Sequence, residues 1–344
     1  MHLLKKAILV IGDLIGLNWL FRKINGGKIR VLMYHGVTSR TPGTFCWTVL
    51  AADKFAWQMH YLKRRYNVRP ASEILTGERS FFEPGRNTVV ITFDDGLENN
   101  FAEAWPVLRN LGLTAVCFVL PGLSQRGEQI WADDLFEFLL KQPAGDLDLS
   151  EYGFGTIQLS ADKESRSGVI ARLLETAKSW PAEQRNRLVD GLIPDRETPG
   201  FARSGLFKLM TIDQINQLAA SREFEIGIHT DNHPIMSVLS PEEQQREITG
   251  AIENLKLGEV RYLPVFAYPN GRPEDFNDDT VSALKKSKIR AAVTTVDALW
   301  DGSFDSYNIP RIGIGGDIDR WEFKARLSGF FYYLAARGGR EQRR

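Results

Sequence analysis

Two adjacent carboxylates close one of the most apolar stretches of the chain. Residues 88–96 read TVVITFDDG, so Asp94 and Asp95 follow a β-branched run that is typical of a buried strand. Neighbouring like charges repel, and each costs desolvation if it is covered. Three of the five histidines, His35, His229 and His233, also stand at or just after the ends of such runs. If the strands are parallel, their carboxyl ends meet on one face, and the spacing predicts one polar cluster there.

These residue types could hold a metal ion and move a proton. Two imidazoles, His229 and His233, with one carboxylate form a three-ligand site for a divalent ion such as Zn²⁺ and leave a position for water. The ion lowers the pKa of that water and polarises a carbonyl, and a second carboxylate can accept the proton. Adjacent aspartates suit this division, because side chains alternate in direction along a strand. Each feature alone is weak, since Asp133-Asp134 and Asp278-Asp279 are pairs with no strand before them.

Seven short apolar runs are predicted to be the strands that position this cluster. They are near-continuous rather than alternating, as expected for strands covered on both faces. The runs are residues 29–35, 88–93, 114–120, 225–230, 264–269, 289–296 and 307–314.

Helical patterns lie between most of these strands. The plainest are residues 53–66, 98–110, 211–220 and 241–257. Two of them begin with capping boxes, Thr211 with Gln214 and Ser240 with Glu243. Alternating strands and helices imply parallel pairing and an α/β fold. Seven strands suggest a closed or nearly closed barrel, and an open doubly wound sheet is the alternative.

One long segment interrupts the alternation. Residues 124–205 are polar and largely helical in pattern, with a helix start near Ser179-Trp180-Pro181 and a loop at PDRETPGFARSG. The pattern predicts a helical insertion between two strands, on the loop side of the barrel.

The motifs at the strand ends resemble those of the polysaccharide deacetylases, the carbohydrate esterases with a NodB-type domain. TFDDG (92–96) resembles their first motif, HTDNHP (229–234) fits their His-(Ser/Thr)-x-x-His-Pro motif, and FAYPNG (266–271) resembles a variant of their third. The resemblance spans residues 28–316 and implies a distorted (β/α)7 barrel. It also implies a deacetylase that hydrolyses the N-acetyl group of an aminosugar in a polysaccharide, oligosaccharide or lipid-linked glycan, with one divalent metal ion, most simply Zn²⁺.

The resemblance also implies roles for single residues. Asp94 would be the general base, and the metal ligands would be Asp95, His229 and His233. Thr230 would brace the histidine loop by hydrogen bonding, and the backbone N–H of Tyr268 would help to stabilise the oxyanion.

Two departures from the family pattern suggest substitute residues. Many members carry an arginine before the third motif to orient the base, and in its absence here Arg311 of IPRIGI is the candidate. Many also use a late histidine as general acid, but no histidine follows His233. LMYHGV (32–37) matches a branch that resembles the poly-N-acetylglucosamine deacetylases, in which the acid comes from the start of the domain. His35 is therefore the candidate acid for the leaving amine.

The two ends of the chain flank this domain. Residues 1–27 form a predicted basic amphipathic helix, which either lies in a membrane interface or packs on the domain. Residues 317–344 are a basic, aromatic helix or tail. No cleavable signal is evident in the printed sequence, so the expected location is cytoplasmic, with peripheral contact at the inner membrane face as an option.

Composition restricts the remaining choices. Lysine plus arginine and aspartate plus glutamate number 43 each, so no overall positive charge points to nucleic acid. Two cysteines, Cys46 and Cys117, allow neither a disulfide framework nor a cysteine zinc site. Two alternatives stay open: a deformylase or O-deacetylase on a lipid-linked sugar, and a non-catalytic glycan-binding relative. A non-catalytic relative would be free to lose the base or a metal ligand. This chain has the base, Asp94, and all three ligands, Asp95, His229 and His233.

Overall fold

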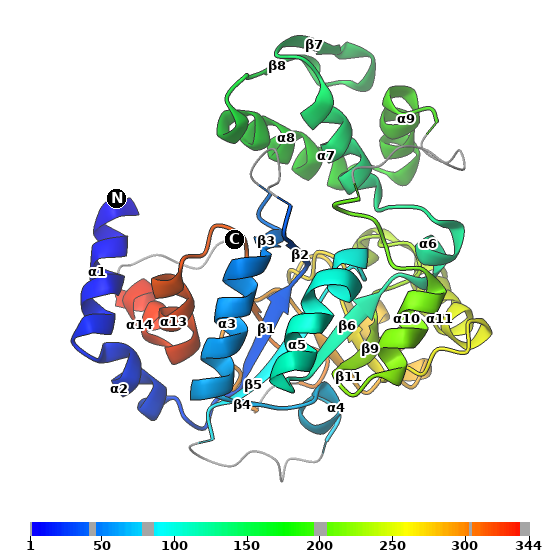
Figure 1. The fold of residues 1–344 in the computed structure, drawn as a ribbon. Helices are drawn as coiled ribbons and strands as arrows, with labels where there is room; N and C mark the ends of the chain where they lie inside the picture. The colour runs from blue at the N-terminus through cyan, green and yellow to red at the C-terminus, as the bar shows by residue number, and fades with distance from the viewer. Residues whose placement is uncertain (1, 41–45, 78–85, 196–204, 303–304, 338–344) are drawn as a thin grey trace.

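A parallel sheet forms the centre of the molecule. The computed structural model describes residues 2–40, 46–77, 86–195, 205–302 and 305–337. The sheet order is β11-β10-β9-β6-β5-β1-β12, and β4 pairs with the start of β5 (Figure 1). The strands are β1 (Arg30–Tyr34), β4 (Asn67–Val68), β5 (Thr88–Phe93), β6 (Ala115–Val119), β9 (Phe224–Ile228), β10 (Val265–Ala267), β11 (Ala291–Val293) and β12 (Ile312–Gly313). Each of the seven predicted runs overlaps one of these strands.

The segment at residues 306–314 joins the two edges of the sheet. On one side, the N–H of Thr294 donates to the carbonyl of Ile309 at 2.8 Å. On the other side, the N–H of Ile314 donates to the carbonyl of Met33 at 2.9 Å, next to the β1–β12 pairing. The sheet therefore curls into a barrel-like layer with helices around it, as predicted, and the open doubly wound alternative is wrong.

Burial on both faces explains why the strands read as continuous apolar runs. In β5, Ile91 and Phe93 belong to the large outer cluster that packs under the helices. Val90 belongs to a second cluster formed mainly by strand residues, such as Val116 and Val293, on the inner side. Because directions alternate along a strand, Thr92 and Asp94 share the inner side with Val90.

Helices cover the outside of the sheet. They are α3 (Ala52–Arg65), α4 (Ala71–Ile74), η2 (Asn100–Ala104) running into α5 (Trp105–Leu111), α10 (Ile212–Ala220), η4 (Met236–Val238), α11 (Pro241–Leu257) and α12 (Asp278–Lys286). Both predicted capping boxes are present, at Thr211 with Gln214 and at Ser240 with Glu243. The helix predicted from residue 98 begins at Asn100, with a π-helical turn.

The predicted insertion lies beyond the carboxyl ends of the strands (Figure 1). It contains α6 (Pro121–Arg126), α7 (Trp131–Lys141), β7 (Gly145–Leu149), η3 (Ser150–Tyr152), β8 (Gly155–Leu159), α8 (Lys163–Lys178) and α9 (Ala182–Leu192). The antiparallel hairpin β7–β8 departs from the helical prediction. Its alternation, GDLDL and GTIQL, is the signal of a half-buried strand. The predicted loop at 194–205 lies mostly outside the described residues.

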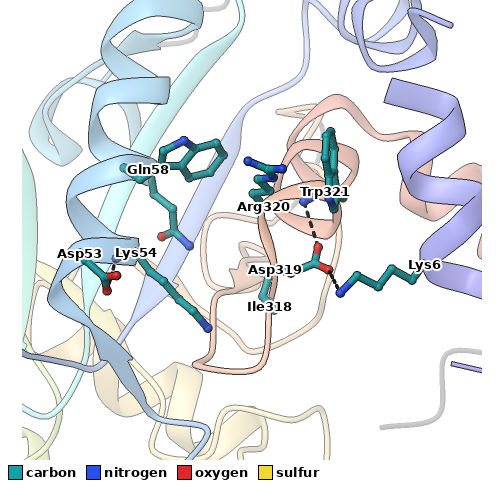
Figure 2. A pocket seen from close by; sticks show the side chains of 9 residues that line it. Lys6, Asp53, Lys54, Gln58, Ile318, Asp319, Arg320 and Trp321 are labelled. Atoms are coloured by element: carbon teal, nitrogen blue, oxygen red, sulfur yellow. Dashed lines mark hydrogen bonds and ion pairs between the residues drawn. The ribbon is translucent and has the colours of Figure 1, made fainter. Parts of the chain in front are cut away.

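The two chain ends pack against each other on the side of the barrel. Helices α1 (His2–Leu14) and α2 (Leu17–Ile24) lie beside α13 (Arg320–Ser328) and α14 (Phe330–Arg337) (Figure 1). Leu9 is buried with Ala325 and Phe330 in a small core. Two ion pairs fasten α1 to this unit: Asp13 with Lys324 at 2.7 Å, and Lys6 with Asp319 at 3.3 Å (Figure 2). In the described part of the chain, no helix is long and apolar enough to cross a membrane.

Candidate active site

The carboxyl ends of the strands bring the predicted residues to one place. Asp94 and Asp95 follow β5, and His229 follows β9 directly. His35 follows β1, and Arg311 precedes β12. The four positions that follow strands lie at the same edge because the strands run parallel, and the side chain of Arg311 reaches Asp94 from the start of β12.

Three side chains form a cluster that could hold a metal ion. One ligand atom from each of Asp95, His229 and His233 lies within 4.8 Å of the others. Oδ1 of Asp95 is 3.4 Å from Nε2 of His229 and 3.6 Å from Nε2 of His233. Ligand atoms bound to a tetrahedral zinc ion at ~2.0–2.1 Å are about 3.3 Å apart. The two imidazole nitrogens are therefore already spaced from Oδ1 of Asp95 much as such an ion requires.

The hydrogen bonds of the histidines prepare them for this use. Nδ1 of His229 lies 2.7 Å from the carbonyl oxygen of Ala267. A proton on Nδ1 satisfies that carbonyl and leaves Nε2 free to act as a ligand, which is the usual arrangement around bound metal ions. The N–H of His233 donates to Oγ1 of Thr230 at 2.9 Å. The predicted bracing of the histidine loop by Thr230 is therefore confirmed.

The protonation of the cluster fits a cation site as well. Burial, with help from neighbouring His229, lowers the pKa of His233 to about 3, so its imidazole is neutral. Burial also acts to lower the pKa of His229, but the hydrogen bond to Asp95 and the charges of both aspartates outweigh it and raise the pKa. A metal ion would take the place of the proton that His229 shares with Asp95, since these ligands bind in deprotonated form.

The backbone is strained at the same residues. Asp95, Thr230 and His233 have φ values of +70°, +69° and +61°. L residues seldom adopt this left-handed region, and a β-branched residue such as Thr230 is a marked exception. Strain of this kind persists where the surrounding structure imposes it, often at functional sites. The cluster is therefore held by the fold rather than by local preference.

Asp94 is not one of the three clustered residues, and Arg311 holds its carboxylate. Nη1 and Nη2 of Arg311 donate to the two oxygens of Asp94 at 2.6 and 2.7 Å, and both side chains are buried. Arg311 also donates to Oγ1 of Thr92 and to the carbonyl of Thr294. Burial acts to raise the pKa of Asp94, but the charge of Arg311 outweighs it, so the pKa lies below the ordinary value. The geometry thus supports the prediction that Arg311 orients this carboxylate.

His35 lies close to both carboxylates. Its ring is half-buried and packs edge-on against Trp47, with the ring centroids 5.4 Å apart. Its carbonyl accepts a hydrogen bond from Nδ2 of Asn100 at 2.6 Å, which anchors the end of β1. Its charge also helps to lower the pKa of Asp94 and of Asp95. These contacts place His35 at the site.

The structure does not support the role predicted for Tyr268. Its backbone N–H donates to the carbonyl of Val293 at 3.3 Å, within the pairing of β10 and β11. Its hydroxyl donates to the carbonyl of Tyr307 at 2.9 Å. The N–H that was expected to bind an oxyanion is engaged in the sheet, because the strand continues pairing one residue beyond its assigned end.

The insertion contributes residues that the sequence analysis set aside. Desolvation raises the pKa of Asp133 in α7 well above its ordinary value, and the charge of Asp95 acts in the same direction. Lys178 of α8 is among the charges that act on His233. Arg272, after β10, forms an ion pair with Glu175 of α8 at 2.6 Å. The insertion therefore borders the site, which no strand-end signal could have indicated.

A separate cavity of about 460 Å³ lies between α1, α3 and the segment at 318–321 (Figure 2). Its walls include Lys6, Trp57, Gln58 and Arg320. Oε1 of Gln58 accepts a hydrogen bond from the hydroxyl of Tyr34, the residue before His35. None of the predicted site residues lines this cavity, so we assign it no part in the chemistry.

Fold and site together define a class. A curled parallel sheet with surrounding helices matches the NodB-type barrel. The Asp-His-His cluster at its carboxyl edge, beside a carboxylate paired with arginine, is an arrangement suited to hydrolysis.

Comparison with known proteins points to one family. Residues 83–137 and 199–292 match the model of the polysaccharide deacetylase family, which this chain therefore resembles. Its members are hydrolases that act on amide bonds of N-acetylated sugars. The unmatched stretch between the two matches falls within the insertion.

Individual relatives agree with this assignment. YxkH of Bacillus subtilis (strain 168), a protein described as a polysaccharide deacetylase, is 31% identical over 101 residues. This alignment covers 27% of the present chain and 32% of that protein, about a third of its length.

Solved structures are similar in fold. The deacetylase PplD of Streptococcus pyogenes, solved with acetate, aligns with a TM-score of 0.57 at 18% identity, over 87% of this chain and 98% of its own. IcaB from Ammonifex degensii aligns with a TM-score of 0.53 at 18% identity, over 88% of this chain and 97% of its own. At these identities the likeness concerns the fold alone.

Proposed function

We propose that this protein is a metal-dependent deacetylase that hydrolyses the N-acetyl group of an aminosugar in a polysaccharide, oligosaccharide or lipid-linked glycan. One observation carries the proposal. Asp94 lies beside the Asp95, His229 and His233 cluster, yet both of its oxygens are held by Arg311. The site thus contains one carboxylate suited to bind an ion and one suited to accept a proton.

The donor set fits one divalent ion, and zinc is our proposal for it. Two neutral imidazoles and one carboxylate are typical ligands of catalytic Zn²⁺, with a coordination position left for water or substrate. When bound, such an ion would lower the pKa of the attacking water and polarise the acyl carbonyl.

The proton transfers are assigned to Asp94 and His35. Each carboxylate oxygen of Asp94 can accept a second hydrogen bond besides the one from Arg311. Asp94 accepts a proton from water while the water oxygen bonds to the acyl carbon. His35 donates a proton to the nitrogen as the carbon–nitrogen bond breaks. The products are acetate and a free amine.

The first prediction concerns the metal. Purified protein is expected to contain about one divalent ion per chain, and chelation should abolish acyl release, because the ion supplies the electrophile. Elemental analysis before and after dialysis against a chelator measures this. A His233→Gln variant should bind the ion more weakly, and His60→Gln, which alters a histidine of α3 outside the cluster, is the matched control. A protein that binds no ion even after reconstitution would refute the metal-dependent function.

The second prediction concerns the acid. His35→Ala should lower the turnover number by roughly 10²-fold or more, as expected for loss of a general acid. Metal content should stay at the wild-type level, because His35 is not part of the cluster. Turnover and metal content measured on the same preparations test the assignment, and an unchanged turnover number would remove His35 from this role. Sugars with an activated leaving group should be less affected than N-acetyl sugars.

A lipid-linked sugar is a second candidate substrate. The group removed from it would be an N-acetyl group, an N-formyl group or an O-acetyl ester. The observation that favours it is the large exposed apolar surface on the terminal helices, described below. A release assay for acetate and formate over free, nucleotide-linked and lipid-linked N-acyl sugars separates these substrates. The Asp94→Asn variant is the control, and release from none of them would favour a non-catalytic glycan-binding relative.

A further inference from the structure

The N-terminal helices expose an unusual amount of apolar surface. Among the described residues, eight of the fourteen exposed large hydrophobic side chains lie between residues 4 and 24. We call these eight the apolar face: Leu4, Ile8, Ile11, Leu14, Ile15, Trp19, Leu20 and Ile24. Single exposed hydrophobic residues need no explanation, but a concentration of this kind marks an interaction surface.

The apolar face follows the geometry of a helix. At 3.6 residues per turn, Leu4, Ile8, Ile11 and Ile15 fall within about 60° of one another around the axis of α1. Leu9, which packs against α13 and α14, points to the opposite side. The helix is therefore apolar on two sides: one side holds it on the barrel, and the other faces outward.

The orientation of α1 is fixed by its contacts with the body of the protein. The ion pair of Asp13 with Lys324 and that of Lys6 with Asp319, the second of which is drawn in Figure 2, flank the packed side. With these contacts in place, α1 cannot turn its apolar face inward without breaking both pairs and the small core around Leu9. The outward side is thus a built feature of the surface.

The charge around the apolar face indicates its partner. Residues 1–28 contain five lysine and arginine residues and one acidic residue. Residues 317–337, which include the helices packed against α1, contain four basic and three acidic residues. The whole chain is neutral, so the rest of the protein carries a net negative charge. Positive charge is therefore gathered at the end of the molecule where the apolar side chains are exposed.

We propose that α1 and α2 dock this protein on an anionic lipid bilayer, with the apolar face inserted at the interface. An apolar stripe that includes a tryptophan, here Trp19, and has basic flanks is typical of a helix that lies in the plane of a membrane surface. Lys23 lies over the Trp19 ring at 5.4 Å, so a cation lies directly beside the apolar face. The proposal includes the cytoplasmic leaflet as the location, because its lipids are anionic.

Vesicle binding tests the proposal directly. The full chain should co-sediment with vesicles of equal parts phosphatidylcholine and phosphatidylglycerol, and much less with vesicles of phosphatidylcholine alone. Binding should weaken at high salt, because the headgroup attraction is screened. Equal binding to both kinds of vesicle, or to neither, would overturn the proposal.

Paired variants test the surface itself. Ile11→Asp with Leu14→Asp should weaken binding to the anionic vesicles by at least about 100-fold, since two large apolar side chains leave the lipid. Val238→Asp with Leu257→Asp is the matched control, because Leu257 is 78% exposed and Leu14 74%. The control should bind as the wild type does. Equal losses in the two double variants would contradict a specific docking face.

A charge variant tests the second half of the proposal. Lys23 and Lys28 are exposed, and Lys23→Glu with Lys28→Glu should weaken anionic binding by about fivefold or more for each charge. All variants lie at exposed positions, and their circular dichroism spectra should match that of the wild type. A second copy of this chain is the competing occupant: a dimer in lipid-free sedimentation that Ile11→Asp with Leu14→Asp dissociates would replace the membrane proposal.

Discussion

Asp94→Asn is expected to lower the rate of acyl release by roughly 10³-fold, the loss typical of removing a general base. Asparagine has nearly the same shape, so hydrogen bonds from Arg311 to the remaining carbonyl oxygen can persist. What is lost is the negative charge that accepts the proton of the attacking water. The metal content should be unchanged, because Asp94 is not one of the three clustered ligands.

Two measurements separate this role from a structural one. The turnover number should fall while the substrate concentration at half-maximal rate changes little, because the base acts on the reacting water rather than on the sugar. Asp278→Asn, which changes an exposed aspartate at the start of α12, is the matched control. If Asp94→Asn turned over near the wild-type rate with normal metal content, another group would have to be the base.

Arg311→Met is expected to destabilise the folded protein by about 3–5 kcal/mol and to alter the pH dependence of catalysis. The substitution leaves the carboxylate of Asp94 buried without its cation. Burial, which Arg311 now outweighs, would then raise the pKa of Asp94. In the wild type the lowered pKa stabilises the fold above the ordinary carboxyl pKa of about 4, and this contribution is lost as the pH falls through the lowered value.

The acidic limb of the pH–rate profile is the readout that a purely structural role would not move. In Arg311→Met it should shift to higher pH, because the base becomes protonated more easily. Arg30→Met is the matched control: Arg30 is equally buried, but its guanidinium donates to the backbone carbonyls of Leu327, Lys28 and Asn25. It should lower the free energy of unfolding without moving the acidic limb. An unshifted limb in Arg311→Met would contradict the positioning role.

Much of the fold was predictable because its signals are local. The near-continuous apolar runs predicted seven of the eight strands of the sheet, all but β4, since burial on both faces leaves no polar alternation. The capping boxes at Thr211 and Ser240 predicted the first turns of α10 and α11, because each depends on residues three positions apart. The convergence of Asp95, His229 and His233 followed from parallel strands alone.

Other features depended on residues that are close only in space. The hairpin β7–β8 was missed, although its alternation is visible in the sequence, because the surrounding segment is polar and mostly helical. The N–H of Tyr268 was expected to be free, but strand register pairs it with Val293. Asp133 had no strand before it, and only the fold of the insertion brings its charge near Asp95.

By itself, then, the sequence determined the succession of strands and helices along the chain, the residue types at the strand ends and the candidate ligands. It did so because hydrophobic periodicity and motif spacing are local properties of the sequence. The sequence offered Arg311 only as a candidate to orient Asp94, and the tertiary structure brings the two together. Arg311 and Asp94 are 217 residues apart, and they meet only because β12 closes the sheet beside β1, which in turn pairs with β5. It also decided which side of α1 faces outward, since that depends on contacts with the other end of the chain.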